Sequence, residues 1–292
     1  MRGLAKRARN RSGFSKPGGR KHMHMHQSTR FTEKLSKAEP ALGTVISFSD
    51  PTVTELIAED MDFVWIDMEH GPQTLQTIQG HVMATNGTGS TPLVRVPWND
   101  PVLIKPVLDC GAEGIIVPMV CTADEARKAV AACLYPPEGV RGFGPRRPSR
   151  YGRLGGPSFC RKLNEEMICI LQIEHIDAIK QIDEIVAVPG ISSLVIGPND
   201  LSGSMDHMGE PRHPEVVRAI EAVLESAGRR GLPVGIGIGA DPKLANEWIE
   251  KGMRWVALGS DFALLLEALQ QARKAMQAAV PDVRSTPANP SS

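Results

Sequence analysis

The chain has 292 residues, of which 41% are hydrophobic and 23% are charged, with 33 basic and 33 acidic residues in balance. This composition is typical of a globular protein, and the length suits one barrel domain of about 250 residues with tails. No segment approaches the roughly 20 consecutive apolar residues that a membrane-spanning helix needs, so we expect no membrane partner.

The first 30 residues differ in charge from the rest of the chain. They hold nine of the Lys and Arg residues and no Asp or Glu, so the remainder carries a net negative charge of nine. An acidic body argues against a nucleic-acid partner. The basic segment has few aliphatic residues, so we predict a disordered tail over residues 1–31. A mitochondrial presequence has a similar composition, but the amphipathic apolar face is missing, and a cytoplasmic location is favoured.

Both ends of the chain predict tails around a single domain at 32–280. In the basic tail, His22, His24 and His26 alternate with Met and could bind a metal, although an incidental run is favoured. Residues 281–292 are rich in Pro and Ser and predict a second disordered tail. The five cysteines show no CxxC spacing, which favours free thiols in a reducing compartment.

Between the tails, short apolar runs alternate with helical patterns. The runs are nearly continuous, as in parallel strands that are buried on both faces. We expect strands at 42–48, 63–67, 93–96, 114–119, 167–174, 191–196, 232–238 and 255–258. We expect helices at 51–59, 73–85, 101–109, 123–133, 175–187, 214–229, 241–251 and 260–279.

Eight repeats of strand and helix predict a (β/α)8 TIM barrel. A doubly wound sheet is disfavoured because no GxGxxG fingerprint follows the first strand. The connection at 135–166 is too long for a plain loop and is rich in Arg, Gly and Pro, so we predict an active-site loop or lid.

Polar side chains end several of the expected strands, where the active sites of TIM barrels lie. Burial of a charge without a partner costs several kcal/mol. A metal, a substrate or mutual ion pairs must therefore compensate the charged residues of this set, which comprises Asp67, Glu69, His70, Arg95, Gln172, Glu174, His175, Asn199 and Asp200.

The fifth and sixth strands provide candidate metal ligands. Glu174 and Asp200 follow neighbouring strands, and their carboxylates suit Mg²⁺, Mn²⁺ or a similar cation that a 2-oxo acid can also chelate. The alternative is that both pair with Arg95 or another cation inside the barrel. Gln172 shares the face of Glu174 and could hold a substrate carboxylate, whereas His175 should point away.

The second and third strands provide candidate catalytic groups. Arg95 is a fixed charge that could stabilise an enolate oxygen, or it could simply pair with Asp67 or Glu69. Histidine side chains ordinarily change charge near neutral pH, so His70 is a candidate general base, although a histidine in such a turn can also cap a helix. Asp109, at the end of an expected helix, could orient the imidazole of His70.

Several motifs occur in an order that resembles one known family. They lie at 63–72 (FVWIDMEHGP), 94–101 (VRVPWNDP), 115–120 (IIVPMV), 135–144 (YPPEGVRGFG), 172–174 (QIE) and 196–202 (IGPNDLS). Over about residues 32–275 the chain resembles the HpcH/HpaI aldolases, which are class II, metal-dependent pyruvate aldolases. The order of independent motifs makes this resemblance specific.

The resemblance implies a role for each matching residue. Glu174 and Asp200 would hold a divalent Mg²⁺, Mn²⁺ or Co²⁺ ion. Arg95 would bind the keto oxygen and stabilise the enolate, and His70 with Asp109 would act as the base. Gln172 and the backbone N–H of Asn199 would contact the 2-oxo acid. Such enzymes are typically homo-hexamers, trimers of dimers that exchange their last helix, so Asp109 would act across an interface.

The sequence departs from the family pattern beside the candidate metal ligands. His175 stands where a small hydroxyl residue is usual, and Asn199 stands where Ala is frequent. These differences put the specificity for the acceptor in doubt more than metal binding. In the expected lid, Arg146 and Arg147 could clamp a carboxylate of the aldehyde partner, or they could coat an exposed loop.

The resemblance implies a reversible aldol cleavage of a 4-hydroxy-2-oxo acid to pyruvate and an aldehyde, which is the reaction of an aldehyde-lyase. The alternative is a condensing or decarboxylating enzyme that acts on oxaloacetate, like the macrophomate synthases or a siderophore-pathway citrate synthase. In either case the lid and the residues after the first strand, Ser47, Ser49 and Asp50, would decide the acceptor.

Three further alternatives are disfavoured. A Schiff-base aldolase needs a lysine at a strand end, whereas Lys105 and Lys180 lie in expected helices. A non-catalytic anion-binding barrel would not explain why two carboxylates, an arginine and a histidine gather at the strand ends. Serine-hydrolase chemistry has no GxSxG motif here.

Overall fold

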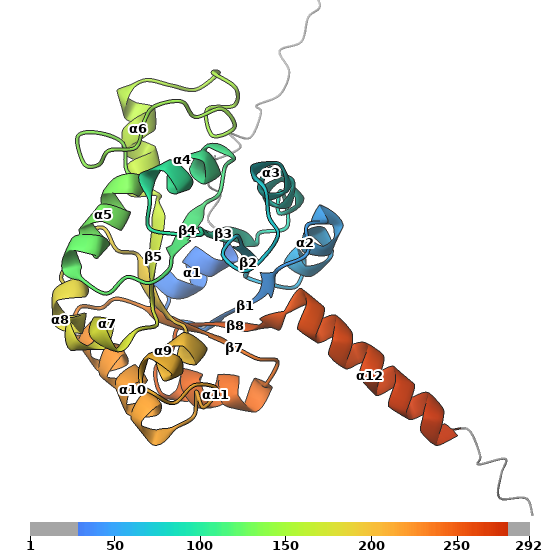
Figure 1. Ribbon diagram of the computed structural model, residues 1–292. Helices are drawn as coiled ribbons and strands as arrows, with labels where there is room; N and C mark the ends of the chain where they lie inside the picture. Colours follow the sequence, from blue (N-terminus) through green and yellow to red (C-terminus); the bar gives the residue numbers. More distant parts are fainter. Residues whose placement is uncertain (1–28, 280–292) are drawn as a thin grey trace, which may run out of the picture.

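Eight parallel strands pair in chain order and close into a barrel in the computed structural model, which describes residues 29–279 (Figure 1). The predicted TIM barrel is thereby confirmed, and every strand begins and ends within two residues of its expected bounds. The tails, including His22, His24 and His26, lie outside the described residues. The strands are β1 Ala41–Ile46, β2 Phe63–Asp67, β3 Thr91–Arg95, β4 Gly114–Val117, β5 Ile168–Ile173, β6 Ser193–Ile196, β7 Val234–Ile238 and β8 Trp255–Ser260.

Helices connect the strands and surround the barrel (Figure 1). Asp50, Asp100 and Asp241 each accept a backbone N–H at the start of a helix whose first turn contains Pro, which is why α2, α4 and α11 begin where they do. The helix expected at 175–187 is instead two short helices, α7 and α8. The helices are α1 Arg30–Ser36, α2 Pro51–Ala58, α3 Leu75–Ala84, α4 Pro101–Asp109, α5 Ala123–Cys133, α6 Pro157–Glu165, α7 Ile176–Lys180, α8 Ile182–Ile185, α9 Pro198–Ser204, α10 Pro214–Arg229, α11 Pro242–Glu250 and α12 Asp261–Ala279.

Helix α1 closes the amino-terminal mouth of the barrel. Phe31 is fully buried, and its ring packs edge-on against Phe63 and Trp255, with centroids 5.2 and 5.7 Å away. These two residues begin β2 and β8. The domain boundary that we expected at residue 32 is therefore too late, because Arg30 and Phe31 already belong to the barrel.

The connection at 135–166 does not cover the carboxyl ends of the strands. The Val140 N–H donates to the Ala131 carbonyl of α5, and Arg141 forms an ion pair with Asp109 at the end of α4. These contacts hold the connection, which includes α6, against the outer helices. The prediction of an active-site lid is wrong within one chain.

Glu113 lies beneath this connection and has an unusual carboxyl group. Burial raises its pKa to about 8, although the charge of Arg147 opposes the shift. Folding raises the pKa of this carboxyl, so the protonated group is compatible with the folded state and the charged group disfavours it. The free energy of unfolding is therefore unaffected below the pKa of the unfolded chain, and it falls as the pH rises from there towards 8. Glu113 therefore becomes a source of instability in alkaline solution.

Glu113→Gln is expected to increase the free energy of unfolding at pH 8–9 by a few kcal/mol, because each pKa unit corresponds to about 1.4 kcal/mol. Below pH 4.5 the variant and the wild type should be nearly equal. Urea unfolding at several pH values measures the difference. The exposed Glu55→Gln on α2 is the control, and an equal gain at acidic and alkaline pH would contradict the assignment.

Helix α12 runs away from the barrel (Figure 1). It has 19 residues, and several large apolar side chains on it are exposed. No helix within residues 29–279 is both long and apolar enough to cross a lipid bilayer. An exposed apolar surface of this kind is typical of a contact with another protein chain. Elsewhere, all five cysteines are free thiols, as predicted.

Candidate active site

The carboxyl ends of the strands border an open cleft of about 940 Å³. This volume suits a small organic ligand. Most of the site residues that we expected from the sequence line the cleft, and they come from the ends of β2, β3, β5 and β6. These residues are His70, Arg95, Gln172, Asn199 and Asp200.

Arg95 ends β3 and is both paired and directed to the cleft. Its Nε and Nη2 donate to the two carboxylate oxygens of Asp67 at 2.8 and 2.6 Å. Its Nη1 lies 2.9 Å from Glu69 Oε2 in an ion pair. Burial opposes the charge of Arg95, but the hydrogen bonds and charges of these partners raise its pKa above the usual value. The expected pairing of Arg95 with Asp67 and Glu69 is therefore confirmed. Its remaining N–H groups are donors that could bind an anion in the cleft.

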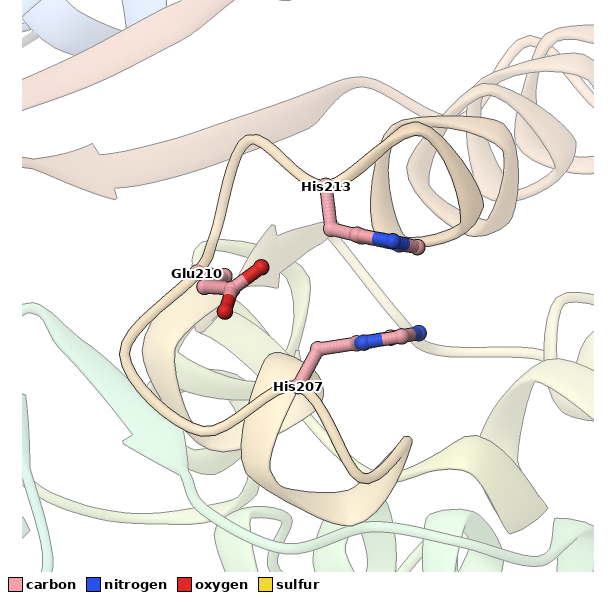
Figure 2. Close-up of side chains that lie close together, drawn as sticks. All are labelled: His207, Glu210 and His213. Atoms are coloured by element: carbon pink, nitrogen blue, oxygen red, sulfur yellow. The ribbon is translucent and has the colours of Figure 1, made fainter.

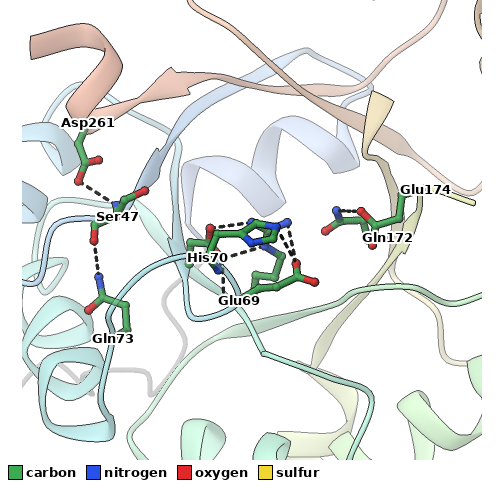
Figure 3. A network of polar contacts seen from close by, with 9 residues as sticks. Ser47, Glu69, His70, Gln73, Gln172, Glu174 and Asp261 are labelled. Carbon is green, nitrogen blue, oxygen red and sulfur yellow. Dashed lines mark hydrogen bonds and ion pairs between the residues drawn. The ribbon is translucent and has the colours of Figure 1, made fainter. Parts of the chain in front are cut away.

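Asp67 has a second role that we did not predict. Its Oδ1 also accepts the backbone N–H groups of Glu69 and His70, at 3.0 and 3.4 Å, and so shapes the turn after β2. The turn presents the His70 side chain, which is 68% exposed, with Nε2 3.9 Å from Glu69 Oε2 (Figure 3). The imidazole is therefore free to meet a ligand in the cleft.

Glu174 follows β5 and is almost completely buried. Its Oε1 accepts the Met119 N–H at 2.8 Å, and its Oε2 accepts a hydrogen bond from the Gln172 amide (Figure 3). Burial and the nearby charges of Glu69 and Asp200 outweigh these hydrogen bonds and raise the pKa of Glu174 to about 7. Among the described residues, no Lys or Arg lies within ion-pair distance of Glu174.

The donors around Glu174 fit a divalent cation. Buried carboxylates need a compensating charge, and hard oxygen ligands suit Mg²⁺, Mn²⁺ or a similar ion. The buried Oε1 of Gln172 has no hydrogen-bond partner and is a further oxygen next to Glu174. Asp200 lies in the first turn of α9, lines the cleft and contributes to the raised pKa of Glu174.

Gly197 is required by this arrangement. A Cβ atom at this position would lie 2.6 Å from Glu174 Oε2 and 3.0 Å from Gln172 Nε2, closer than atoms in contact can approach. Gly197→Ala is therefore expected to displace both side chains and to weaken metal binding at least about tenfold. Calorimetric titration with Mn²⁺ measures this, and Gly228→Ala on α10, where the added methyl meets no atom within 4 Å, is the control. An unchanged affinity for Mn²⁺ would show that Gly197 does not support the proposed metal ligands.

Asp109 does not meet His70 within one chain. It is the last residue of α4, which starts at the cleft end of β3 and runs back along the outside of the barrel. Its carboxylate instead accepts a hydrogen bond from Arg141 at 2.9 Å. The expected pair of His70 and Asp109 is therefore not formed in the described chain, and only a contact between chains could form it.

Three other expected candidates also lie away from the cleft. His175 caps α7 through Nδ1, which accepts the Asp177 N–H at 3.1 Å, so it points away as expected. Arg147 donates to the Asn86 side chain at 3.2 Å. Neither Arg146 nor Arg147 lines the cleft, so these arginines form no carboxylate clamp within one chain.

A second group of potential metal ligands lies in the loop before α10, where His207, Glu210 and His213 lie close together (Figure 2). The two histidines already have other partners. His207 Nε2 lies 3.1 Å from the Glu215 carboxylate, and His213 Nδ1 accepts the Glu215 N–H at the start of α10. Their rings stack with centroids 3.5 Å apart. Helix capping and pairing with Glu215 explain this cluster.

Comparison with known proteins identifies the family. The model of the HpcH/HpaI aldolase/citrate lyase family matches residues 45–268. A 4-hydroxy-2-oxo-heptane-1,7-dioate aldolase of Shigella flexneri is 41% identical over 243 residues, which cover 82% of this chain and 90% of the relative. The chain therefore belongs to the HpcH/HpaI aldolase/citrate lyase family. It is an enzyme of the carbon–carbon lyase class.

Solved structures agree with this assignment. The HpcH/HpaI aldolase of Desulfitobacterium hafniense superposes with a TM-score of 0.82 at 30% identity, covering 87% of this chain and 98% of that one. The citrate synthase SbnG superposes with a TM-score of 0.77 at 26% identity, covering 87% and 99%. The fold is thus shared with a structure named as an aldolase and with one named as a citrate synthase.

Proposed function

We propose that the chain is a divalent-metal-dependent aldolase that reversibly cleaves a 4-hydroxy-2-oxo acid into pyruvate and an aldehyde. One observation carries the proposal: the buried carboxylate of Glu174 forms no ion pair with a Lys or Arg of the described residues, and it contacts Gln172, which lines the cleft together with Asp200 and Arg95. The relatives named as 4-hydroxy-2-oxo-heptane-1,7-dioate aldolases support the substrate class.

Glu174 and Asp200 would hold the metal ion, and Mg²⁺, Mn²⁺ and Co²⁺ are the proposed candidates. When bound, such an ion acts as a Lewis acid that polarises the keto group of the substrate. Gln172 and the backbone N–H of Asn199 would bind the carboxylate of the 2-oxo acid. These groups lie at the ends of β5 and β6, so they would fix the pyruvate half of the substrate on one side of the barrel.

His70 and Arg95 would carry the proton and the charge. In the cleavage direction, the His70 imidazole takes the proton of the 4-hydroxyl group. The C3–C4 bond breaks, its electron pair forms the C2–C3 double bond of an enolate, and C4 leaves as the aldehyde carbonyl. The free N–H groups of Arg95 stabilise the negative charge on the enolate oxygen. Protonation of C3 then yields pyruvate.

We also propose a homo-hexamer, built as a trimer of dimers that exchange α12. The exposed apolar side chains of α12 support a partner chain on this helix, and they include Phe262, Leu265, Leu266 and Leu269. In such an assembly Asp109 would reach the cleft of a neighbouring subunit and meet its histidine base there. Light scattering tests the assembly, and a monomeric mass would leave Asp109 without this role.

A cytoplasmic location is proposed with this function. The relatives are bacterial aldolases, and all five cysteines are free thiols, which is typical of a reducing compartment.

The second candidate is a metal-dependent condensing or decarboxylating enzyme that acts on oxaloacetate, and the similarity to a citrate synthase structure favours it. It would use the same enolate chemistry with a different acceptor. A Schiff-base mechanism is disfavoured, because no lysine is found among the described residues that line the cleft.

The deciding experiment removes metal with a chelator and then restores Mg²⁺, Mn²⁺ or Co²⁺. Pyruvate and a matching aldehyde released from 4-hydroxy-2-oxo acids only after metal is restored would establish the aldolase. Release of CO₂ from oxaloacetate without aldol cleavage would favour the condensing enzyme. Activity that is indifferent to chelation would overturn the role of Glu174 and Asp200.

A further inference from the structure

The loop at residues 47–49, here called the cleft loop, follows β1 and forms one wall of the cleft. Two side chains outside the substrate region bind its backbone. We propose that these residues, Gln73 and Asp261, are positioning residues that fix the cleft loop and thereby determine which aldehyde the enzyme accepts. This inference rests on the proposed aldolase function and extends it to the acceptor.

Asp261 binds the N–H side of the cleft loop. It is the first residue of α12 and is 5% exposed. Its Oδ2 accepts the Ser47 N–H at 2.9 Å (Figure 3). The same oxygen accepts the Phe48 N–H at 2.8 Å. A carboxylate that accepts two backbone N–H groups makes strong, charge-assisted hydrogen bonds.

Gln73 binds the carbonyl side of the same two residues. Its Nε2 donates to the Ser47 carbonyl at 3.1 Å (Figure 3). It also donates to the Phe48 carbonyl at 2.9 Å. Two side chains therefore satisfy all four backbone polar groups of Ser47 and Phe48. A surface loop usually bonds to water at such groups and moves more freely, so this loop is unusually restrained.

The orientation of the Gln73 amide is itself fixed. Backbone carbonyls only accept hydrogen bonds, so the amide nitrogen must face the cleft loop and Oε1 must face the other way. There, Oε1 accepts from Thr77 Oγ1 at 2.8 Å and lies 3.2 Å from His81 Nε2. Because Oε1 can only accept, His81 carries its proton on Nε2, and its Nδ1 accepts from Thr54 Oγ1 at 2.8 Å. His81 and Thr54 are fully buried, so the contact between them, at the inner end of this chain of contacts, is shielded from water.

The position of the cleft loop around the barrel indicates which part of a substrate it meets. The strands close in chain order, so β1 lies opposite β5. The groups proposed to hold the pyruvate half follow β5 and β6. The carbon chain beyond C3 of a bound 4-hydroxy-2-oxo acid must therefore extend towards the other walls, where Ser47, Phe48 and Ser49 line the cleft.

The isosteric change Gln73→Glu tests the proposal. It keeps an oxygen towards Thr77 and His81, but it replaces the donor amide by an oxygen that faces two carbonyls. The wild type and the variant are compared as holoenzymes in two assays. One follows the metal-dependent exchange of the pyruvate methyl hydrogens in D₂O, which needs only the pyruvate half of the site. The other follows condensation of pyruvate with a short aliphatic aldehyde and with an aldehyde that carries a carboxylate.

We expect the exchange rate to stay within about twofold, whereas kcat/KM for condensation falls about tenfold or more and the ratio between the two aldehydes changes. Asp261→Asn, which keeps one acceptor oxygen, should show the same pattern with a smaller loss. Gln76→Glu and Gln79→Glu introduce the same charge at exposed positions of α3 and should behave like the wild type.

Three outcomes would overturn the proposal, and they can be told apart. Equal losses of exchange and condensation would mean that Gln73 supports the fold or the metal site in general. An unchanged ratio of kcat/KM between the two aldehydes would show that the cleft loop does not select the acceptor. A wild type that neither exchanges pyruvate hydrogens nor cleaves 4-hydroxy-2-oxo acids with any metal would reject the proposed function, and the inference with it.

Discussion

Glu174→Ala is expected to lower kcat/KM for aldol cleavage at least about a thousandfold, which corresponds to about 4 kcal/mol of transition-state stabilisation. The physical reason is the loss of the carboxylate that adjoins both Gln172 and the cleft. Asp200 is exposed at the start of a short helix and cannot hold a divalent ion tightly by itself. Activity that remains should no longer respond to added metal.

The stability of the Glu174→Ala protein separates loss of the ion from loss of the fold. Burial raises the pKa of Glu174, so its charged form disfavours folding of the metal-free chain near neutral pH. The metal-free variant should therefore unfold no more easily than the metal-free wild type. Calorimetry measures metal affinity and melting together, and Glu184→Ala on the exposed face of α8 is the control. Metal-dependent activity that survives in Glu174→Ala would place the ion elsewhere.

Arg95→Ala is expected to reduce both activity and stability. The Arg95 side chain is only 10% exposed, and its removal leaves Asp67 and Glu69 buried without their cation. Breaking a buried ion pair from one side costs about 3 kcal/mol or more of unfolding free energy. Loss of the charge that faces the enolate oxygen should lower kcat by about a hundredfold to a thousandfold.

The pH dependence distinguishes the two effects of Arg95→Ala. Burial raises the pKa of Glu69, and the charge of Arg95 opposes this shift. Without Arg95 the Glu69 carboxylate should therefore take up a proton more readily as the pH falls, so the stability deficit should shrink in acid, whereas the loss of kcat should persist. Arg95→Lys keeps the charge but cannot form the two parallel bonds to Asp67, so we expect it to restore stability partly and activity little. Full activity in Arg95→Lys would show that a point charge is sufficient.

The strands were predictable from the sequence because they are buried on both faces. Runs such as 63–66 and 168–171 are continuously apolar, and polar residues such as Asp67 and Gln172 mark where the strands end. Helix α1 was missed because Phe31 is its only fully buried residue and a basic segment precedes it. The connection at 135–166 was assigned to the cleft because its length and composition do not reveal where it docks.

The candidate site was predictable where strand ends provide it. His70, Arg95, Gln172 and Asp200 meet at the cleft because the carboxyl ends of parallel strands share one end of a barrel. Contacts that depend on the mutual placement of helices were not predictable. Asp261 and Gln73 are far apart in the chain, and they are related only because both bind the backbone of the loop between β1 and α2. The partner of Asp109 was likewise fixed by tertiary structure, since Arg141 belongs to the connection at 135–166.

In the proposed hexamer, the start of α12 would link the shape of the cleft thermodynamically to the association of chains. Asp261 holds the cleft loop, and the helix that it begins leaves the barrel with exposed apolar side chains. A neighbouring chain that prefers one orientation of α12 would also favour one position of Asp261. It would thereby shift the equilibrium between positions of the cleft loop that Asp261 binds. Linkage is reciprocal, so a substrate that prefers one loop position must strengthen or weaken the association of chains by the same free energy. In that assembly, filling the cleft with substrate would change the affinity between chains, and a change in assembly would change the affinity for substrate.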